Sequence, residues 1–355
     1  MRTRSATLPG TDPRPRLTVD LGAVRRNMAA LRALRPSVPV MPVVKANCYG
    51  LGSARIVPVL AEAGASGFFI SYKEEAERIA EYADGLPFYV LNTLPGADGY
   101  TDQIRPVHHS VEELLAFKGP CGMQVEGGMN RIGAQLDDVS RLPPQTQVDL
   151  VILHMSHAGE PAAEANDDQR TAFSDAKVAL REVFPNAAFG HSATGGALQG
   201  GHPEEDFIRP GIGLYGAKAG QLGPMDCAAT LEAAVLSVFE VKPGEKVGYS
   251  HRFTAQRPTR LATLGIGYAD GPPRSLLHRG KALLNGVRCP YAGAVSMDLL
   301  TVDVTDAGEI ARGDWAEIFG PNLPVDELAE MAGTIGYELL TAVRGRTQRV
   351  YVDEG

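Results

Sequence analysis

The sequence predicts an α/β fold: a (β/α)8 TIM-type barrel followed by a mostly-β C-terminal domain. Over the first two thirds of the chain, short apolar runs alternate with helical patterns about eight times in about 200 residues, which matches a barrel in count and size. After the Gly-rich stretch 216–224, strand-like runs follow one another without intervening helices. A doubly wound open sheet is the alternative for the first part.

The expected parts are a flexible leader over residues 1–15, a barrel over 16–224 and a β domain over 225–355. Within the leader, Pro9, Pro13 and Pro15 would break any amphipathic helix. The run 38–46 is continuous and β-branched, as in a strand buried on both faces. The expected barrel strands are 17–21, 38–46, 67–72, 87–92, 122–127, 148–155, 187–192 and 207–216.

Helical patterns lie between these strands. After 17–21, the apolar residues Val24, Met28, Leu31 and Leu34 fall on one helix face. Further helices are expected over 74–84, 111–118 and 167–184. In the β domain, strands are expected within 229–241, 259–269, 286–304, 314–320 and 347–353, with one helix over 325–333 that Asp326 can cap.

Composition excludes several classes of protein. A formal charge of −8 provides no basic stripe for a nucleic acid backbone. No apolar run approaches the roughly 20 residues needed to span a bilayer, so we expect no membrane partner and a cytoplasmic location. The four cysteines are widely separated without metal-ligand spacing, which fits a reducing compartment.

Lys45 ends the most apolar strand of the chain, where a barrel places its reactive groups. A buried ammonium is costly, so this side chain must be paired, exposed at the barrel mouth or neutralised by a covalent bond. A Schiff base with an aldehyde cofactor achieves the last of these. A strand-end lysine in solvent is the alternative.

The segment 207–216 contains Gly211, Gly213 and Gly216 in the order GxGxxG. A dinucleotide fingerprint requires an amphipathic helix directly afterwards, and the chain continues instead into AKAGQLGPMD. The pattern therefore indicates a Gly-rich turn whose amides can cradle one phosphate. Arg209, just before it, can pair with an anion, face a cofactor ring or lie at the surface.

Other candidates also follow strands. Arg131 lies in a Gly-rich strand exit and can bind a carboxylate through its planar fork. His154 and Ser192 each end an apolar strand, and His154 can equally be a structural histidine. His154, His157 and Glu160 can be read as metal ligands, but they begin inside a strand, so we expect no metal.

In the expected β domain, GIGYADG (265–271) presents Tyr268 between glycines on a strand exit. A phenol with a pKa of about 10 is a poor base at neutral pH unless a cation or hydrogen-bond donor lowers that value. This motif alone does not establish chemistry.

Together and in order, several motifs resemble the alanine racemase family from about residue 16 to 352. They are VVKANCYGLG, GGMNRIG, the strand before His154, HSAT, IRPGIGLYG, VGYSHRFTA, GIGYADG, VSMD and GTIGYELLT. The resemblance implies a barrel that holds pyridoxal 5'-phosphate and a β domain that contributes to the partner subunit's active site. It also implies a head-to-tail homodimer with two shared sites.

By this resemblance, Lys45 is the Schiff-base lysine and one catalytic base, and Tyr49 lies near the phosphate. His154 lies behind the cofactor ring. Arg209 faces the pyridine nitrogen and keeps it unprotonated, which weakens the electron sink and shortens the life of the carbanion. Ser192, Gly211 and Ile212 match phosphate-binding positions.

The substrate side is implied in the same way. Arg131 resembles the residue near the phenolate oxygen and the substrate carboxylate. Tyr268 is similar to the second base, and Met297 to a residue whose backbone amide contacts the carboxylate. Both come from the partner subunit. Bases on two faces of the substrate give inversion at Cα.

Two positions depart from the family pattern. Many members carry a lysine seven residues before the arginine of GMxR, where this chain has Gln124. Gln124 can still accept a hydrogen bond from Arg131 through its amide oxygen. Gly345 stands where some members have a tyrosine that narrows the substrate entrance. We therefore expect a wider entrance and a substrate that is alanine or a neighbour such as serine.

Two other functions fit the same architecture. A pyridoxal-phosphate decarboxylase of basic amino acids would carry an acidic residue opposite the ring in place of Arg209. A non-catalytic pyridoxal-phosphate carrier would lack the second domain, whereas about 130 residues remain after position 224 here.

Overall fold

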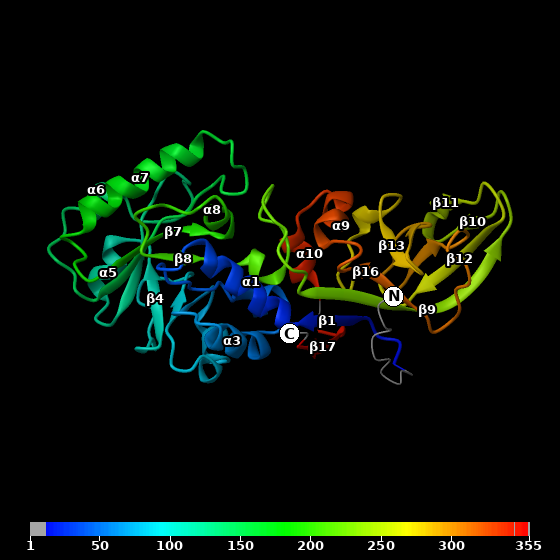
Figure 1. The fold of residues 1–355 in the computed structure, drawn as a ribbon, viewed down its shortest axis with the longest axis horizontal. Coiled ribbons are helices and arrows are strands. Elements are labelled where there is room, and N and C mark those ends of the chain that lie inside the picture. The colour runs from blue at the N-terminus through cyan, green and yellow to red at the C-terminus, as the bar shows by residue number, and fades with distance from the viewer. Residues whose placement is uncertain (1–11, 344, 354–355) are drawn as a thin grey trace. The chain divides into compact units, whose positions relative to one another are not determined.

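The computed structural model describes residues 12–343 and 345–353. These residues form two compact units (Figure 1). The barrel unit comprises residues 20–228 and 353, and the β unit comprises 12–19 and 229–352. Among the described residues no helix is both long and apolar enough to cross a membrane.

The barrel unit confirms the expected fold class. In the described part of the chain its seven named strands are parallel and follow one another in chain order. They are β2 (Phe68–Ile70), β3 (Phe88–Val90), β4 (Ile104–His108), β5 (Cys121–Gln124), β6 (Val148–Ile152), β7 (Ala188–Ala193) and β8 (Phe207–Arg209). The run expected as a strand over 38–46 closes the barrel, since Val40 bridges Ile208 and Val43 bridges Phe69.

The closing segment forms bridges rather than a continuous strand because Pro39 and Pro42 have no N–H to donate. The amides of Met41 and Val43 bond to the carbonyls of Ile208 and Pro210, at 2.9 and 2.8 Å. The Val44 amide turns the other way, to Phe69 O at 2.8 Å. The strand before Lys45 is therefore held from both sides.

Helices surround the strands, and the expected apolar face of the first is largely confirmed. Val24, Met28 and Leu31 are buried, whereas Leu34 is exposed. Asp20 caps this helix by accepting from Ala23 N at 3.0 Å. The helices are α1 (Leu21–Leu34), α2 (Lys45–Tyr49), α3 (Ser53–Glu62), α4 (Lys73–Glu77), η1 (Ala80–Tyr82), α5 (Val111–Ala116), α6 (Leu136–Val139), α7 (Ala165–Leu180), α8 (Thr194–Leu198) and η2 (Ile212–Tyr215).

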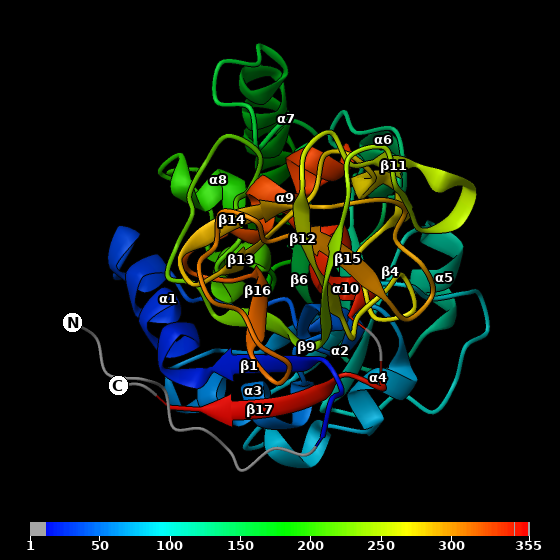
Figure 2. The ribbon, with the colours of Figure 1, turned by 90° about the vertical axis from the view of Figure 1, so that its right-hand side faces the viewer.

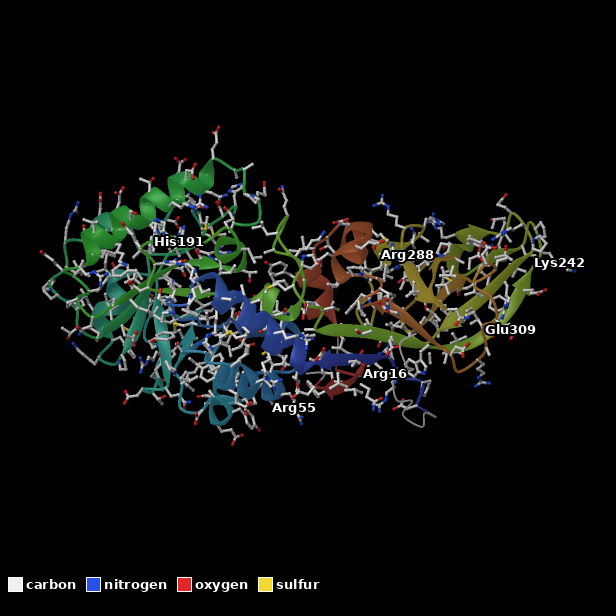
Figure 3. All side chains as sticks on the ribbon, in the orientation of Figure 1. Arg16, Arg55, His191, Lys242, Arg288 and Glu309 are labelled. Carbon is white, nitrogen blue, oxygen red and sulfur yellow. The ribbon has the colours of Figure 1, made fainter. Side chains whose placement is uncertain are left out.

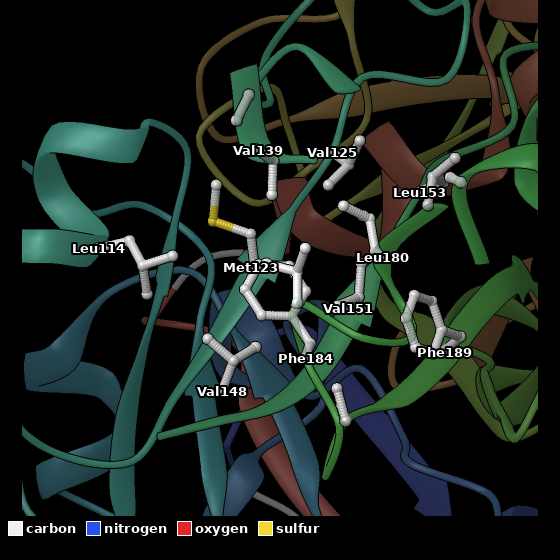
Figure 4. Packing of buried hydrophobic residues seen from close by; sticks show 14 of the residues in the cluster. Leu114, Met123, Val125, Val139, Val148, Val151, Leu153, Leu180, Phe184 and Phe189 are labelled. Atoms are coloured by element: carbon white, nitrogen blue, oxygen red, sulfur yellow. The ribbon is translucent and has the colours of Figure 1, made fainter. Parts of the chain in front are cut away.

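Side chains from helix α7 and from strands β5 to β7 form one buried hydrophobic cluster, part of which Figure 4 shows. Phe173 and Leu180 from this helix are buried with Met123, Val151 and Phe189 from the strands. Each such side chain contributes roughly 1.5–3 kcal/mol when fully buried. This packing fixes the strands whose carboxyl ends carry the candidate site residues.

The β unit is built around one long strand, β9 (Ala229–Val241), which matches the expected strand. It pairs antiparallel with β1 (Arg16–Asp20), β12 (Thr259–Leu264) and β16 (Trp315–Phe319), which are labelled in Figure 2. The other strands are β10 (Lys246–Val247), β11 (Phe253–Thr254), β13 (Lys281–Leu284), β14 (Val287–Pro290), β15 (Leu300–Asp303) and β17 (Gln348–Val352). The helices are η3 (Tyr249–His251), η4 (Arg274–Leu276), α9 (Val325–Ala332) and α10 (Gly336–Ala342).

The strand expected over 17–21 is not a barrel strand. As β1 it pairs with β9 in the β unit, with Leu17 opposite Leu231. Arg16, labelled in Figure 3, bonds to Glu232 at 2.7 Å and lies 4.4 Å from the ring centroid of Trp315. Alternating burial specifies a half-buried strand but not the sheet it joins.

Two boundaries therefore differ from the expected domains. Residues 225–228 group with the barrel unit and 16–19 with the β unit. Of the expected leader, residues 1–11 lie outside the described residues, and Pro15 at its end accepts a hydrogen bond from Gln348 N at 2.8 Å.

Asp326 does not cap α9, because the helix begins after Pro324 and Asp326 lies buried in its first turn. Asp326 thus lies two residues past the cap position at Pro324, too far along the helix for the capping role expected for it. Helix α10 follows directly and was not expected from the sequence.

Candidate active site

Lys45 is followed by a turn of left-handed helix. Ala46, Asn47, Cys48 and Tyr49 have φ of 53°, 58°, 53° and 54°. Each non-glycine residue in this conformation costs roughly 1–2 kcal/mol. Such strain persists only where the surroundings enforce it, and it concentrates at functional sites. The turn therefore marks Lys45 independently of any motif.

Specific hydrogen bonds hold this strained turn. Gly50 N donates to Ala46 O at 2.8 Å, and Asn47 Oδ1 accepts from Ser53 N at 2.8 Å. The Glu75 carboxylate accepts from Ala46 N at 2.8 Å and from the amides of Ser71 and Tyr72 at 3.2 Å. Glu75 thereby fastens the turn to the end of β2.

The surroundings of Lys45 favour its neutral amine. Burial lowers the pKa of Lys45, and the positive charges of Arg131 and Arg209 lower it further, while Glu75 opposes them. An uncharged amine is the form that attacks a carbonyl carbon. Lys45 therefore has the environment of a nucleophile.

Arg209 and His154 form a pair next to this amine. Nη2 of Arg209 donates to Leu153 O at 2.7 Å and to Nδ1 of His154 at 3.3 Å. Burial lowers the pKa of Arg209 to about 10, so its guanidinium stays charged at neutral pH. Burial and the neighbouring Arg209 lower the pKa of His154 to about 3. A cation thus faces a neutral imidazole.

One nitrogen of Arg209 has no hydrogen-bond partner in the described part of the chain. Nε of Arg209 is buried and makes no hydrogen bond with any described residue. Burying a charged N–H without an acceptor costs free energy, so we expect a bound molecule to supply an acceptor for Arg209 Nε.

The loop that carries Arg131 is held by Glu126 and Gln124. Burial would raise the pKa of Glu126, but hydrogen bonds from the amides of Asn130 and Met129 outweigh it and lower the pKa. Gln124 donates from Nε2 to Ile132 O at 3.0 Å. Within the described residues no hydrogen bond joins Gln124 to Arg131, so the acceptor role expected for Gln124 is not seen; it holds the backbone of the loop instead.

The Gly-rich turn after β8 is closely packed. The amides of Gly211 and Gly213 donate to Thr194 Oγ1, at 2.9 and 3.3 Å. A Cβ at Gly211 would lie 2.4 Å from the Tyr49 hydroxyl oxygen, so a larger residue here would have to displace that side chain. The short helix η2 follows, starting at Ile212, in place of the long helix of a dinucleotide site.

The structure separates the two hydroxyls of the HSAT motif. Thr194 lies against Gly211, whereas Oγ of Ser192 is buried without a partner among the described residues. A Cβ at Gly196 would lie 2.9 Å from Ser192 Oγ. Thr194 is thus a candidate that sequence reasoning missed, although it is part of the same motif.

Tyr268 and Met297 lie side by side in the β unit. Tyr268 N donates to Ser296 O at 3.0 Å, and Ala269 N donates to Met297 O at 3.1 Å. Both side chains are partly exposed, Tyr268 at 37% and Met297 at 53%. In residues 12–343 and 345–353 no group of three or more His, Cys, Asp or Glu could hold a metal ion.

Two family models match this chain. "Alanine racemase, N-terminal domain" matches residues 19–219, and "Alanine racemase, C-terminal domain" matches 228–351. The chain belongs to the alanine racemase family. This confirms the family suggested by the motifs.

Family members of known sequence match nearly the whole chain. The alanine racemase of Acidiphilium cryptum is 39% identical, covering 95% of this chain and 98% of that protein. That of Methylobacterium sp. (strain 4-46) is 38% identical, again with 95% and 98% coverage.

Solved structures of the family agree with the fold. The alanine racemase of Bartonella henselae with covalently bound pyridoxal phosphate aligns with a TM-score of 0.89 at 30% identity, covering 96% of this chain and 100% of that one. The biosynthetic alanine racemase of Pseudomonas aeruginosa aligns with a TM-score of 0.85 at 31% identity, with 96% and 100% coverage.

In this alanine racemase family member, the barrel unit brings together Lys45, Arg131, His154 and Arg209, which influence one another electrostatically. Tyr49 and Gly211 meet beside them. Tyr268 and Met297 are grouped separately in the β unit. Besides Thr194, sequence reasoning missed Glu75, which follows a strand end as a barrel site residue should.

Proposed function

We propose that this protein is a pyridoxal-phosphate-dependent racemase that interconverts L- and D-alanine or a similarly small amino acid. The observation that carries the proposal is that Arg209 Nε has no hydrogen-bond partner among the described residues, although it is buried beside a neutral His154 and near a lysine whose pKa is lowered. Family relatives named alanine racemase support the same reaction.

The residues present fit pyridoxal phosphate. The cofactor has a ring nitrogen that can accept from Arg209 Nε, an aldehyde that can bind an amine and a phosphate that needs hydrogen-bond donors. Ser192 Oγ is another buried polar atom of the barrel unit without a hydrogen-bond partner among the described residues. At Gly211 the backbone approaches the Tyr49 hydroxyl more closely than any side chain would permit.

The phosphate would be held by the Gly-rich turn. We assign its donors to the backbone amides of Gly211 and Ile212 and to the hydroxyls of Tyr49, Ser192 and Thr194. The Gly211 amide, which donates to Thr194 Oγ1 in this structure, would donate to the phosphate instead. Successive amides in such a turn form a concave anion site.

When bound, the cofactor withdraws electrons from Cα of the substrate and so acidifies its proton. Lys45 would hold the cofactor, and its free amine would take or return the Cα proton on one face of the substrate. Arg209, with a pKa of about 10, keeps its own proton and donates a hydrogen bond to the ring nitrogen without protonating it. Arg131 binds the substrate carboxylate from the barrel side.

The second base would be Tyr268, supplied by the partner subunit of a homodimer with shared active sites. The Met297 backbone N–H would contact the substrate carboxylate from the same subunit. Acid and base on opposite faces give inversion at Cα. No disulfide joins the cysteines of the described residues, which fits a reducing compartment, and we infer a cytoplasmic enzyme that can supply D-alanine for biosynthesis.

The test is incubation of the holoenzyme with L-alanine in deuterated water. We expect deuterium at Cα and formation of D-alanine, and Lys45→Ala should lose both this activity and the visible absorbance of the bound cofactor. Tyr268→Phe should keep the absorbance and retain exchange from one enantiomer without inversion. Release of carbon dioxide from lysine or ornithine, with no D-alanine formed, would overturn the proposal.

A further inference from the structure

Arg346 joins the two loops of the β unit that carry Tyr268 and Met297. Its Nε donates to Asp270 Oδ1 at 2.6 Å, and its Nη2 lies 3.1 Å from Asp270 Oδ2. The same Nη2 reaches Asp298 Oδ1 at 2.7 Å and Met297 O at 3.4 Å. One guanidinium therefore contacts both GIGYADG and VSMD.

Asp270 transmits this contact to Tyr268. Its carboxylate is almost fully buried, with 2% of the side chain exposed, and Oδ2 accepts from Gly267 N at 2.9 Å. Its own amide donates to Gly267 O at 2.9 Å. These bonds close the turn around Tyr268 and Ala269. The charge on the buried carboxylate is matched by Arg346, so the turn and the arginine form one structure.

The neighbouring loop is fixed against the same turn. Ser296 O accepts from Tyr268 N at 3.0 Å. In a trans peptide the N–H points opposite to the preceding carbonyl, so the Met297 N–H points away from the Tyr268 backbone. A Cβ at Gly267 would lie 2.3 Å from the carbonyl oxygens of both Ser296 and Met297. The two backbones are therefore in direct contact.

The planar fork of arginine suits this bridge. It meets the Asp270 carboxylate with two N–H groups and still reaches Asp298, which a single ammonium cannot reproduce. The side chain is 48% exposed, so the ion pairs themselves add little to the free energy of unfolding. What they do is fix the geometry of two loops.

We propose that Arg346 is a positioning residue that sets the Tyr268 hydroxyl and the Met297 N–H in one fixed relation for the reaction. The inference deepens the proposed racemase function and rests on it. Both groups would have to meet one substrate at the same time. A displacement of about 1 Å at such groups costs on the order of 100-fold in rate.

The experiment compares Arg346→Ala and Arg346→Lys with Arg257→Ala in the holoenzyme. Arg257 is a matched control: it pairs with Asp306 in the same unit, and its side chain is 53% exposed. The first readout is amide hydrogen exchange followed by mass spectrometry over peptides containing 265–271 and 295–300. We expect faster exchange in both peptides in Arg346→Ala and no change in barrel peptides.

The second readout is steady-state kinetics. We expect kcat for alanine to fall by on the order of 100-fold in Arg346→Ala, with the visible absorbance of the bound cofactor unchanged. Arg346→Lys should retain only part of the wild-type kcat. Added guanidinium ion at low concentration should raise the kcat of Arg346→Ala. Arg257→Ala should behave as wild type in both readouts.

Several outcomes would overturn the proposal that Arg346 positions the two loops. Exchange or kcat of Arg346→Ala equal to that of Arg257→Ala would do so, as would full recovery by lysine. Should Arg346→Ala fail to fold, Asp298→Asn keeps the test, since it removes one contact and should raise exchange in 295–300. If the wild-type protein exchanges no Cα proton of alanine, the proposed function fails. The amide hydrogen-exchange result still decides whether Arg346 positions the two loops.

Discussion

Nη2 of Arg209 donates a hydrogen bond to Nδ1 of His154 across 3.3 Å. The acceptor role of Nδ1 leaves the single proton of the neutral imidazole on Nε2. Burial and, next, the charge of Arg209 lower the pKa of His154 to about 3. The arginine thus helps to keep the histidine neutral at physiological pH.

Acid sensitivity should arise in part from buried histidines. Burial, with Arg209 next, lowers the pKa of His191 from 6.5 to about 3, and its ring packs against Phe173 under α7, where Figure 3 labels it. As pH falls below 6.5 the unfolded chain binds a proton that the folded chain refuses, so stability falls with pH. By about pH 5 the loss is about 2 kcal/mol.

His191→Leu should remove that loss. Neither ring nitrogen of His191 has a hydrogen-bond partner among the described residues, so an apolar side chain forfeits no bond. Urea unfolding at about pH 7.5 and about pH 5 measures the difference for the variant and for His251→Leu, an exposed control. An unchanged pH dependence in His191→Leu would contradict this origin.

Glu75→Gln should lower the pKa of Lys45. Burial and two arginines already lower it, and Glu75 is the carboxylate that opposes them. The rate at which cofactor-free protein acquires visible absorbance with pyridoxal phosphate follows the neutral amine, so its midpoint should move to lower pH. Glu74→Gln, one residue earlier and exposed, is the control. A shift toward higher pH, or an equal shift in the control, would refute the role of Glu75.

Gly211→Ala should destabilise the cofactor-free protein by about 1–3 kcal/mol, because the new methyl group meets the Tyr49 hydroxyl oxygen at 2.4 Å. Tyr49→Phe in the same chain removes that oxygen and should restore part of the stability. Thermal unfolding of the two single variants and the double variant measures the coupling. Additive effects would show that the close approach is not the cause.

Gly345→Tyr should fold normally, since a Cβ at Gly345 meets no described atom within 4 Å. If the missing tyrosine widens the substrate entrance, the wild type should accept serine comparatively well, and the variant should lose kcat/KM for serine more than for alanine. The control is Gly345→Ala, which adds only a methyl group. Gly313→Tyr, at another open glycine of the β unit, is less suitable because the positive φ of Gly313 strains any side chain. Equal losses for both substrates would contradict the wider entrance.

Sequence patterns predicted the barrel because its strands are continuous apolar runs, which few other structures require. Strand β4 (Ile104–His108) was not predicted, because Pro106 and the charged Arg105 before it interrupt that apolar pattern. The prediction that residues 17–21 form a barrel strand was wrong for another reason. Its alternating burial would satisfy either sheet, and only the pairing of Leu17 with Leu231 decides between them.

Some residues of the candidate site could likewise be predicted from the sequence and others could not. Lys45 could be found from its strand, but the left-handed turn after it has no glycine until Gly50 and so no local signal. Thr194 and Ser192 share one motif, and only the packing shows which hydroxyl meets Gly211. Arg346 and Asp270 are 76 residues apart, a separation over which no motif links them.

The pairing of β1 with β9 also bears on biogenesis. Strand β1 is made before the barrel and must wait for Ala229 and its neighbours before it has a partner, and it then lies between β9 and the later strand β17. Ribosomes elongate at about 5–20 residues per second, so that delay lasts on the order of 10 seconds or more. Throughout it, Leu17 and Val19 have no sheet to cover them. The barrel is thus synthesised as an insertion within the β unit, and it can collapse before its neighbour is complete.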